Sequence, residues 1–501
     1  EGSVRFPAGS SLAGRCVVAR DAEAYRRSHG EYPDYEWDGA AAEVPDMVRT
    51  GRFQLANTGD EITLYRERSP VQKVEWPGMV STRQGQVHYL QDGTWDARVL
   101  MLGQSQFGEA AFGGVNGIAF VSPDCSQEVF LSLAGSARRE VLVAAYEFTS
   151  PVLAQALIDA AGRGVNVSVL LEGGPVGGIS GEEEWVISRL GESGVPVYTM
   201  SGTRDVHAPY RYMHAKYMVV DRSDVLVTSE NFKGSGFPGR GTRGNRGFGV
   251  VVTHPGLAGY LASVFSHDAG GRFTVRATAG CGTEEVPSMD AYSPAFEPYA
   301  FSGATVTPVI SPDTSSLLHG LIGEAEESVD IEMAYITNES GAVLNPFLAD
   351  AIDAARRGAR VRVLLDSYYY NVEGDSDNDE MVEVINGIAA AEGLALEARC
   401  ADISPGRVEK IHNKGAIVDA RRVLVSSINW NANSPANNRE VALIVDHPGA
   451  GEYFTAVFES DWDQAGQSGV PGRGPDPVKL AAAALVVAAL VVLFRYRNRG
   501  R

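Results

Sequence analysis

The chain has 501 residues, an apolar fraction of 44% and a formal net charge of −20. Its length allows several domains, and its apolar content excludes a disordered chain. The sequence holds only six lysines, so nearly all positive charge is arginine. This acidic, lysine-poor composition resembles that of proteins from salt-loving microbes, with an ordinary acidic exported protein as the alternative. In molar salt the screening length falls to about 3 Å, so the charge does not exclude polyanionic partners.

Residues 1–110 carry short alternating runs punctuated by glycine and proline, without a long stretch of helical period. They predict a β domain. The run from Phe53 to Leu64, followed by Val71–Trp76, resembles the lamin-tail family. That resemblance implies a small immunoglobulin-like sandwich. Its usual first strands are absent, so we expect a domain truncated at its N-terminus, with an unrelated β module as the alternative.

From about residue 120 onward the chain repeats itself, and Val121–Asp124 returns as Ile310–Asp313. In each half, apolar β-branched runs alternate with helical segments, such as Leu153–Ala161 and Asn345–Arg356. This alternation predicts an α/β domain with a largely buried sheet. We therefore expect two facing, pseudo-twofold repeats, at 111–266 and 308–465, joined by a linker at 267–307.

The C-terminal region predicts a membrane anchor. A Gly/Pro linker at 466–477 precedes an apolar segment at 478–494, which would be about 26 Å long as a helix. That length is the short limit for one transmembrane helix. The arginine-rich tail 495–501 is expected to be cytoplasmic by the positive-inside tendency, which puts the folded domains outside the cell. A buried core helix is the alternative.

The cysteines do not indicate a metal site. They lie far apart, without a CxxC or Cys/His cluster, at Cys16, Cys125, Cys281 and Cys400. A zinc site is therefore not expected. Their disulfide state stays open.

The most informative feature is a His-x-Lys-x4-Asp motif that occurs twice. Its copies are His214, Lys216 and Asp221, and His412, Lys414 and Asp419. A Ser-x-Asn segment follows each copy, with Ser229 and Asn231 in the first and Ser427 and Asn429 in the second. On a strand, the His and Lys share one face and the Asp points away. We interpret the two aspartates as structural groups whose carboxylates bond local backbone N–H groups.

A site built from both copies holds two imidazoles, two ammonium groups and two side-chain amides. These groups suit a phosphodiester, because ammonium and amide donors stabilise the oxygens of a pentavalent phosphorus. One neutral imidazole attacks phosphorus while the other, protonated, donates to the leaving oxygen. Water then hydrolyses the phosphohistidine. This scheme requires no metal or other cofactor.

The duplicated motif with its trailing Ser-x-Asn resembles the phospholipase D superfamily over both repeats. The resemblance implies the two-histidine mechanism; members cleave or transfer phosphatidyl groups, synthesise cardiolipin or cut nucleic acids. It also implies an acidic residue that orients histidine. Glu440 fits this role in the second half, whereas the matching position of the first half is Gly247. We expect His214 as nucleophile and His412 as general acid; the reverse, with Glu440 steadying His412, is the alternative.

A basic loop runs from Lys233 to Gly247, just after the first motif. It offers candidate clamps for phosphate oxygens or lipid headgroups, at Arg240, Arg243 and Arg246. A mobile, solvated loop is the alternative. Further candidates for substrate contact, with simple packing as their alternative, are His207, Tyr368, Tyr369 and Tyr370.

The sequence thus predicts a membrane-anchored phosphoric diester hydrolase that acts on phospholipid headgroups, by hydrolysis or transfer. An extracellular nuclease of the same superfamily and a weakly active surface-binding protein are the alternatives. The oligomeric state and the ligand of the N-terminal domain stay open.

Overall fold

The computed structural model describes residues 2–12, 14–56, 59–76, 85–91, 93–95, 100–202, 208–278, 280–338, 343–373 and 377–465. The chain forms two compact units. The first comprises Glu1–Gln104, Ser201–Pro209 and Gly271–Phe273, and the second Ser105–Met200, Tyr210–Gly270 and Thr274–Arg501. His207 and the predicted anchor with its linker and tail, 466–501, lie outside the described residues. Within the described ranges, no helix is long and apolar enough to span a bilayer.

The first unit consists of short strands and one helix. Its described strands pair two by two: β1 (Gly2–Arg5) with β4 (Val48–Gly51), β2 (Val18–Ala19) with β3 (Tyr35–Glu36), β5 (Asp60–Arg66) with β6 (Ser69–Trp76), β7 (Gln86–Val87) with β10 (Leu100–Met101), and β8 (Leu90–Gln91) with β9 (Thr94–Trp95). Helix α1 (Ala22–His29) starts where the Asp21 carboxylate accepts a hydrogen bond from Ala24 N. The β class is right, but the immunoglobulin-like sandwich is not confirmed. The strands β5 and β6 are largely exposed, so they bury too little to hold two sheets together.

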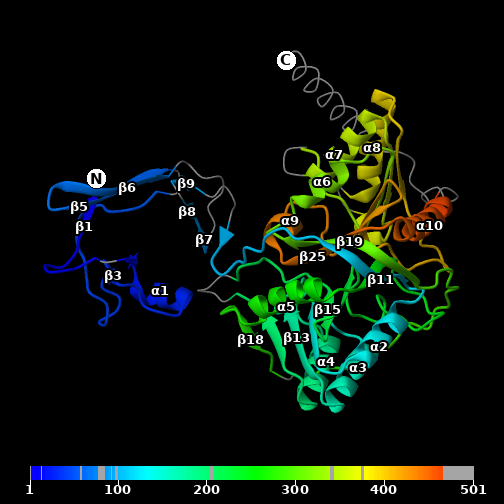
Figure 1. Ribbon diagram of the computed structural model, residues 1–501, viewed down its shortest axis with the longest axis horizontal. Coiled ribbons are helices and arrows are strands. Elements are labelled where there is room, and N and C mark those ends of the chain that lie inside the picture. Colours follow the sequence, from blue (N-terminus) through cyan, green and yellow to red (C-terminus); the bar gives the residue numbers. More distant parts are fainter. Residues whose placement is uncertain are drawn as a thin grey trace. The chain divides into compact units, whose positions relative to one another are not determined.

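The second unit is built on one fifteen-stranded sheet that contains both repeats (Figure 1). Its order is β18-β14-β13-β12-β15-β16-β17-β11-β19-β25-β24-β23-β20-β21-β22. At the centre, β11 (Phe112–Ser122) and β19 (Tyr299–Ser311) pair antiparallel. Read outward from this pair, the two sides follow the same order, apart from the additional edge strand β18. The predicted α/β repeats are confirmed, and the β11–β19 pairing joins them into one sheet.

The strands of the two repeats correspond one to one. In the first repeat they are β12 (Glu140–Ala145), β13 (Asn166–Glu172), β14 (Val197–Met200), β15 (Tyr217–Val220), β16 (Asp224–Thr228) and β17 (Gly247–Thr253), with β18 (Thr274–Arg276) at the edge. In the second they are β20 (Ser328–Met333), β21 (Arg360–Leu365), β22 (Leu396–Cys400), β23 (Lys414–Val418), β24 (Arg422–Ser426) and β25 (Glu440–Asp446). The predicted linker is shorter than 267–307, because β18 and β19 take both of its ends into the sheet.

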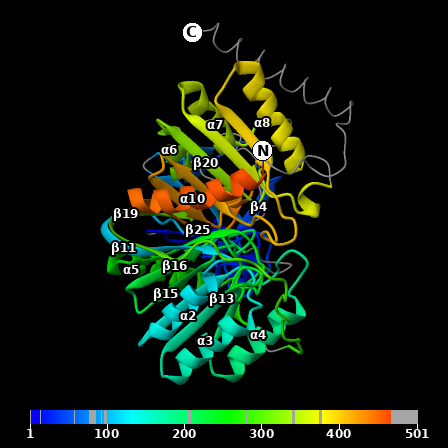
Figure 2. The same ribbon diagram turned by 90° about the vertical axis from the view of Figure 1, so that its right-hand side faces the viewer.

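Helices cover the sheet in each repeat. The first repeat has α2 (Ser126–Ser136), α3 (Pro151–Gly162), α4 (Gly181–Glu192) and α5 (Pro255–Ala269). The second has α6 (Leu317–Gly323), α7 (Pro346–Arg357), the 3-10 turn η1 (Tyr369–Asn371), α8 (Asn378–Glu392), α9 (Ser434–Asn437) and α10 (Pro448–Ala465). Figures 1 and 2 show α2–α4 and α6–α8 on opposite sides of the central strands β11 and β19.

The two predicted helices are α3 and α7, and local sequence explains their starts. The Ser150 hydroxyl accepts from Leu153 N at 3.4 Å, and the Asn345 side chain accepts from Phe347 N at 3.1 Å. Each cap satisfies an N–H group that has no partner in the first turn of the helix. Helix α7 ends at Gly358, whose φ of 111° lies in the region that favours glycine.

Candidate active site

The two His-x-Lys motifs lie at the starts of equivalent hairpins. Strands β15 and β16 pair antiparallel, as do β23 and β24. In the first hairpin, Thr228 N donates to Lys216 O at 3.2 Å, which places the following Ser-x-Asn segment beside the His-x-Lys pair. The predicted hairpin arrangement is therefore confirmed.

Each histidine backbone is held by the opposite repeat. His214 N donates to Arg439 O at 2.8 Å, and His412 N donates to Arg246 O at 2.9 Å. These bonds bring the two motifs together at the contact between the repeats. A single site made from both halves is the result.

Buried carboxylates fix the residue that precedes each histidine. Glu172, at the end of β13, accepts from Met213 N at 2.5 Å, and Asp366, just after β21, accepts from Ile411 N at 2.7 Å. Burial raises the pKa of Glu172 to about 7 and that of Asp366 to about 6, although the backbone donors oppose it. In both repeats, a buried carboxylate at the end of the equivalent strand thus fixes the backbone just before the histidine.

Glu440 serves His214 and not His412. His214 Nδ1 lies 2.8 Å from Glu440 Oε2 and 3.0 Å from Oε1. Burial acts to raise the pKa of Glu440, but the charge and hydrogen bond of His214, together with the charge of Lys216 and a hydrogen bond of Ser427, outweigh it and the pKa is lowered. Burial lowers the pKa of His214 against the charge of Glu440. Assigning Glu440 to the second-half histidine was wrong, because residue 440 follows the Arg439 carbonyl that binds the first-half histidine.

His412 faces a carboxylate that the sequence reasoning missed. Its Nδ1 lies 3.4 Å from Oε1 of Glu230, the middle residue of the first Ser-x-Asn segment. Glu230 is fully buried. The expectation that one histidine lacks a carboxylate because position 247 is glycine was therefore wrong. The signal was present in the sequence, since Glu230 is an acidic residue inside the motif itself.

The two motif lysines are buried, and their ammonium groups lie close enough to influence each other. Lys216 Nζ donates to His214 O at 2.6 Å, and Lys414 Nζ donates to His412 O at 2.5 Å. Burial lowers the pKa of Lys216 to about 8. Burial and the charge of Lys216 lower the pKa of Lys414 to about 7. An anion placed between these groups would favour their charged forms, so the site is suited to a phosphate group.

The Ser-x-Asn residues have two different roles. The hydroxyls of Ser229 and Ser427 donate to main-chain carbonyls of the next strand, at 3.4 and 3.2 Å. Asn231 Nδ2 donates to Glu147 at 2.8 Å. Among the described residues, the side-chain oxygens of Asn231 and Asn429 are buried without a hydrogen-bond partner. The serines therefore fix the loops, and each asparagine leaves a buried side-chain oxygen without a partner among the described residues.

The two motif aspartates are structural, as predicted. The Asp221 carboxylate accepts from the backbone N–H groups of Arg138, Arg139 and Glu140. The Asp419 carboxylate accepts in the same way from Glu326, Glu327 and Ser328. These donors lie at the start of the neighbouring strand, not in the local turn that the sequence suggested. Each aspartate thus ties its hairpin to β12 or β20.

The arginines of the basic loop bind protein groups. Arg246 is 2% exposed and pairs with Asp124 at 2.7 Å and Asp461 at 2.6 Å. Arg243 donates to main-chain carbonyls of the second repeat, including Ile403 O at 2.6 Å. The prediction that these two arginines clamp substrate was therefore wrong, because their donors are used within the fold. Arg240 forms an exposed ion pair with Glu297.

Lys410 is a cation near the site that the sequence reasoning did not single out. Its Nζ donates to Tyr370 Oη at 2.8 Å and lies 5.8 Å from the ring centroid of Tyr368. Its charge contributes to lowering the pKa of His412, after burial and Lys414. The signal was its rarity, as one of six lysines and two residues before the histidine.

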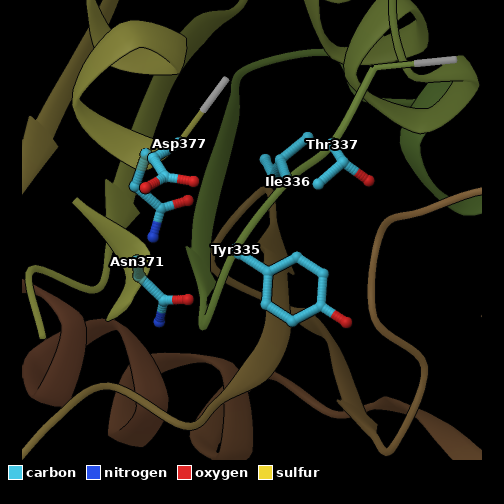
Figure 3. Close-up of a pocket in the computed structure, with 6 residues that line it drawn as sticks. Tyr335, Ile336, Thr337, Asn371 and Asp377 are labelled. Atoms are coloured by element: carbon cyan, nitrogen blue, oxygen red, sulfur yellow. The ribbon is translucent and has the colours of Figure 1, made fainter. Parts of the chain in front are cut away.

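An open cavity of about 160 Å³ lies in the second repeat. It is lined by Tyr335, Ile336, Thr337, Asn371, Asp377 and Asn378. Figure 3 shows Tyr335, Ile336 and Thr337 on one wall, with Asn371 and Asp377 opposite. The Tyr335 hydroxyl accepts from Asn431 Nδ2 at 2.9 Å. Burial raises the pKa of Tyr335 to about 12, and the charge of Glu440 adds to the shift, so this wall of the cavity lies within electrostatic range of Glu440.

A family model described as "Cardiolipin synthase, PLD-like domain" matches residues 130–269 and 318–462, more than half of the chain. The chain belongs to the phospholipase D superfamily. The match leaves out residues 1–110, for which the lamin-tail interpretation stays a prediction. Within the described part of the chain, no cluster of three or more His, Cys, Asp or Glu side chains could hold a metal ion.

Individual relatives of this phospholipase D-like chain are distant. The mitochondrial cardiolipin hydrolase of Homo sapiens is 32% identical over 124 residues, which are 25% of this chain and 43% of that protein. The protein of the same name from Chlamydomonas reinhardtii is 25% identical over 154 residues, 30% of this chain and 59% of that protein. The chain thus covers less than two thirds of either relative.

Two solved structures are similar to parts of the chain. One is Nuc from Salmonella typhimurium, described as a phospholipase D family member, with 24% identity, a TM-score of 0.27 and coverage of 34% of this chain and 100% of that one. The other is the phosphatidylserine synthase of Haemophilus influenzae Rd KW20, with 13% identity, a TM-score of 0.48 and coverage of 70% and 86%.

Proposed function

We propose that this phospholipase D-like protein is a phosphodiesterase that cleaves or transfers a phospholipid headgroup through a phosphohistidine intermediate. One observation carries the proposal: two histidines from different repeats each direct Nδ1 toward a buried carboxylate, Glu440 and Glu230. A histidine whose Nδ1 is held in this way presents Nε2 for chemistry. Two imidazoles and two lysines would then surround one anion.

In the first step, Nε2 of neutral His214 attacks phosphorus. A P–N bond forms while the bond from phosphorus to the leaving oxygen breaks, and protonated His412 gives its Nε2 proton to that oxygen. The imidazole of the intermediate carries positive charge, which ionised Glu440 stabilises. This is the physical reason to prefer His214 as the nucleophile.

In the second step, neutral His412 takes a proton from water as the water oxygen attacks phosphorus. The P–N bond breaks, and His214 and a phosphate monoester are released. An alcohol in place of water gives transfer. Throughout both steps, Lys216 and Lys414 stabilise the phosphoryl oxygens.

A lipid is the preferred substrate class for two reasons. The curated relatives carry the name cardiolipin hydrolase, and the apolar segment 478–494 predicts an anchor in a membrane. An anchor would raise the effective concentration of lipid at the site. A nuclease is the second candidate, because nucleic acids carry the same phosphodiester chemistry.

The alternative of a weakly active surface-binding protein is less well supported by the site. It depended on a missing carboxylate in the first half, and Glu230 supplies a carboxylate to His412. A decayed site would not be expected to keep two buried lysines and two buried acids in these positions, since unpaired buried charges destabilise a fold.

The test uses the full chain in EDTA with either cardiolipin and phosphatidylglycerol vesicles or single-stranded DNA. The His214→Ala/His412→Ala protein is the blank. Headgroup or phosphatidic acid release that the blank lacks supports the lipid enzyme. DNA cleavage alone would move the protein to the nuclease candidate, and no turnover of any phosphodiester by a folded protein would refute the proposal.

A further inference from the structure

The two repeats differ at one pair of corresponding positions. The second Asn-Arg segment ends in Glu440, and the first ends in Gly247. The Ser-x-Asn segments differ in the opposite sense, with Glu230 in the first repeat and Ile428 in the second. Each repeat therefore contains one acid, on a different strand end.

The space at Gly247 is filled by the Glu230 side chain. A Cβ at position 247 would lie 2.3 Å from Glu230 Oε1 and 2.6 Å from Ser229 Oγ. Contacts this short exclude any side chain at 247 while Glu230 keeps its place. The glycine thus accompanies the glutamate, and its φ is not in the left-handed region, so backbone conformation does not require it.

The two acids are held by equivalent asparagines. Asn245 Nδ2 donates to Glu230 Oε2 at 2.9 Å, and Asn438 Nδ2 donates to Glu440 Oε1 at 3.0 Å. These asparagines stand two residues apart from Gly247 and Glu440 in the matching segments. The carboxylates therefore occupy corresponding places in the two halves, although they come from different positions.

The facing atoms of the second pair have no other partner. Among the described residues, Glu230 Oε1 and His412 Nδ1 are both buried and without a hydrogen bond. They lie 3.4 Å apart. A small rotation of either side chain would form a hydrogen bond between them. Without that bond, two buried polar atoms lack a partner, which is unfavourable.

We propose that Glu230 is the positioning residue of His412. From the Ser-x-Asn segment after β16, it does for His412 what Glu440, at the start of β25, does for His214. It acts through the imidazole, by fixing the ring so that Nε2 faces the leaving oxygen. The expected effect of Glu230 on the reaction rate rests on the proposed function. Its expected effect on the orientation and titration of the His412 ring does not.

The burial and charges around the pair favour the proton on Glu230 while the site is empty. Burial raises the pKa of Glu230 to about 7 against Asn245 and the charges of Lys414, Lys410 and Lys216. Burial lowers the pKa of His412, and the same three lysines and His214 lower it further. A bound phosphodiester anion would favour the proton on His412, where general acid catalysis needs it, and leave Glu230 ionised.

The experiment gives the first repeat the arrangement of the second. Glu230→Ile removes the acid, and Glu230→Ile with Gly247→Glu copies the Ile428–Glu440 arrangement that the second repeat already accommodates. Glu230→Gln keeps the shape and removes the charge. All variants are checked for folding by circular dichroism and thermal melting.

We expect Glu230→Ile and Glu230→Gln to lower kcat about 100-fold or more, with less change in KM, and the double variant to recover at least tenfold over Glu230→Ile. In ¹⁵N-histidine spectra, the titration of His412 should move to lower pH in Glu230→Ile and back in the double variant. Unchanged kcat in folded Glu230→Gln, or an unchanged His412 titration in Glu230→Ile, would overturn the inference. The spectra decide it even if no phosphodiester is turned over, so its failure is distinct from that of the proposed function.

Discussion

The substitution Glu440→Gln tests the His214–Glu440 pair most directly. The glutamine side chain keeps the size of glutamate and the acceptor for Asn438, but it removes the charge that faces His214 Nδ1 at 2.8 Å. Glu440 is fully buried, so water does not replace the lost charge. Both the orientation of the ring and the stability of the cationic phosphohistidine should suffer.

The magnitude follows from the role of Glu440 beside His214. Replacing the carboxylate that orients a catalytic histidine by its amide can lower kcat by up to about 10⁴-fold, and acid–base catalysis by a positioned side chain contributes about 10²- to 10⁴-fold. We expect kcat to fall roughly 10²- to 10⁴-fold. The folded-state pKa of Glu440 is lowered, so its stability contribution is present at neutral pH and is lost as pH falls through that pKa.

The assay is single-turnover cleavage of a phosphodiester substrate, with acid-quenched samples examined for the phosphoenzyme. Glu192→Gln, an exposed acid on α4 with a side chain 63% exposed, is the matched control and should keep wild-type rates. A folded Glu440→Gln protein with kcat within threefold of wild type would refute the assignment of Glu440 to the nucleophile.

Three further predictions address the supports and charges of the site. Asp221→Ala should lower the free energy of unfolding by about 1–3 kcal/mol, because three backbone N–H groups lose their acceptor and alanine must adopt the φ of 51° at position 221. The kcat of the folded variant should stay within twofold of wild type. A larger loss of kcat would show that the aspartate is catalytic. Arg439→Met should destabilise the second unit by about 3–5 kcal/mol in urea unfolding, since Asp268 loses its buried partner at 2.8 Å; an unchanged midpoint would contradict this. The value of kcat/KM should fall as pH rises through the lowered pKa of the general acid His412, and further through about 7 to 8, where Lys414 and Lys216 lose protons. The corresponding limbs of kcat should lie at higher pH, because a bound phosphate anion stabilises the protonated forms. Coincident limbs would argue against phosphate contact by these groups.

Sequence alone was sufficient for the features that depend on local order. Patterns of a few residues predict the alternation of buried strands with capped helices, the duplication and the His-x-Lys hairpins. The structural role of Asp221 also followed from strand parity. These predictions hold because side-chain direction along a strand depends only on the count of residues.

The assignments that failed all involve partners far apart in the chain. Arg246 belongs to a basic loop by sequence, yet it is a buried ion-pair partner of Asp124 and Asp461. The N-terminal β pattern did not determine how many strands would pair, since sheet formation depends on the area that the strands can bury together.

Which acid serves which histidine was decided only by the tertiary structure. Glu440 lies 226 residues from His214, and the matching position of the other repeat is glycine. Aligning the repeats suggested that one histidine lacks an acid, because an alignment compares equal positions and not equal places in space. The fold brings each Asn-Arg segment against the opposite histidine, and Glu230 reaches His412 through the space that Gly247 leaves open. The sequence determined the chemical groups of the site, and long-range packing determined their pairing.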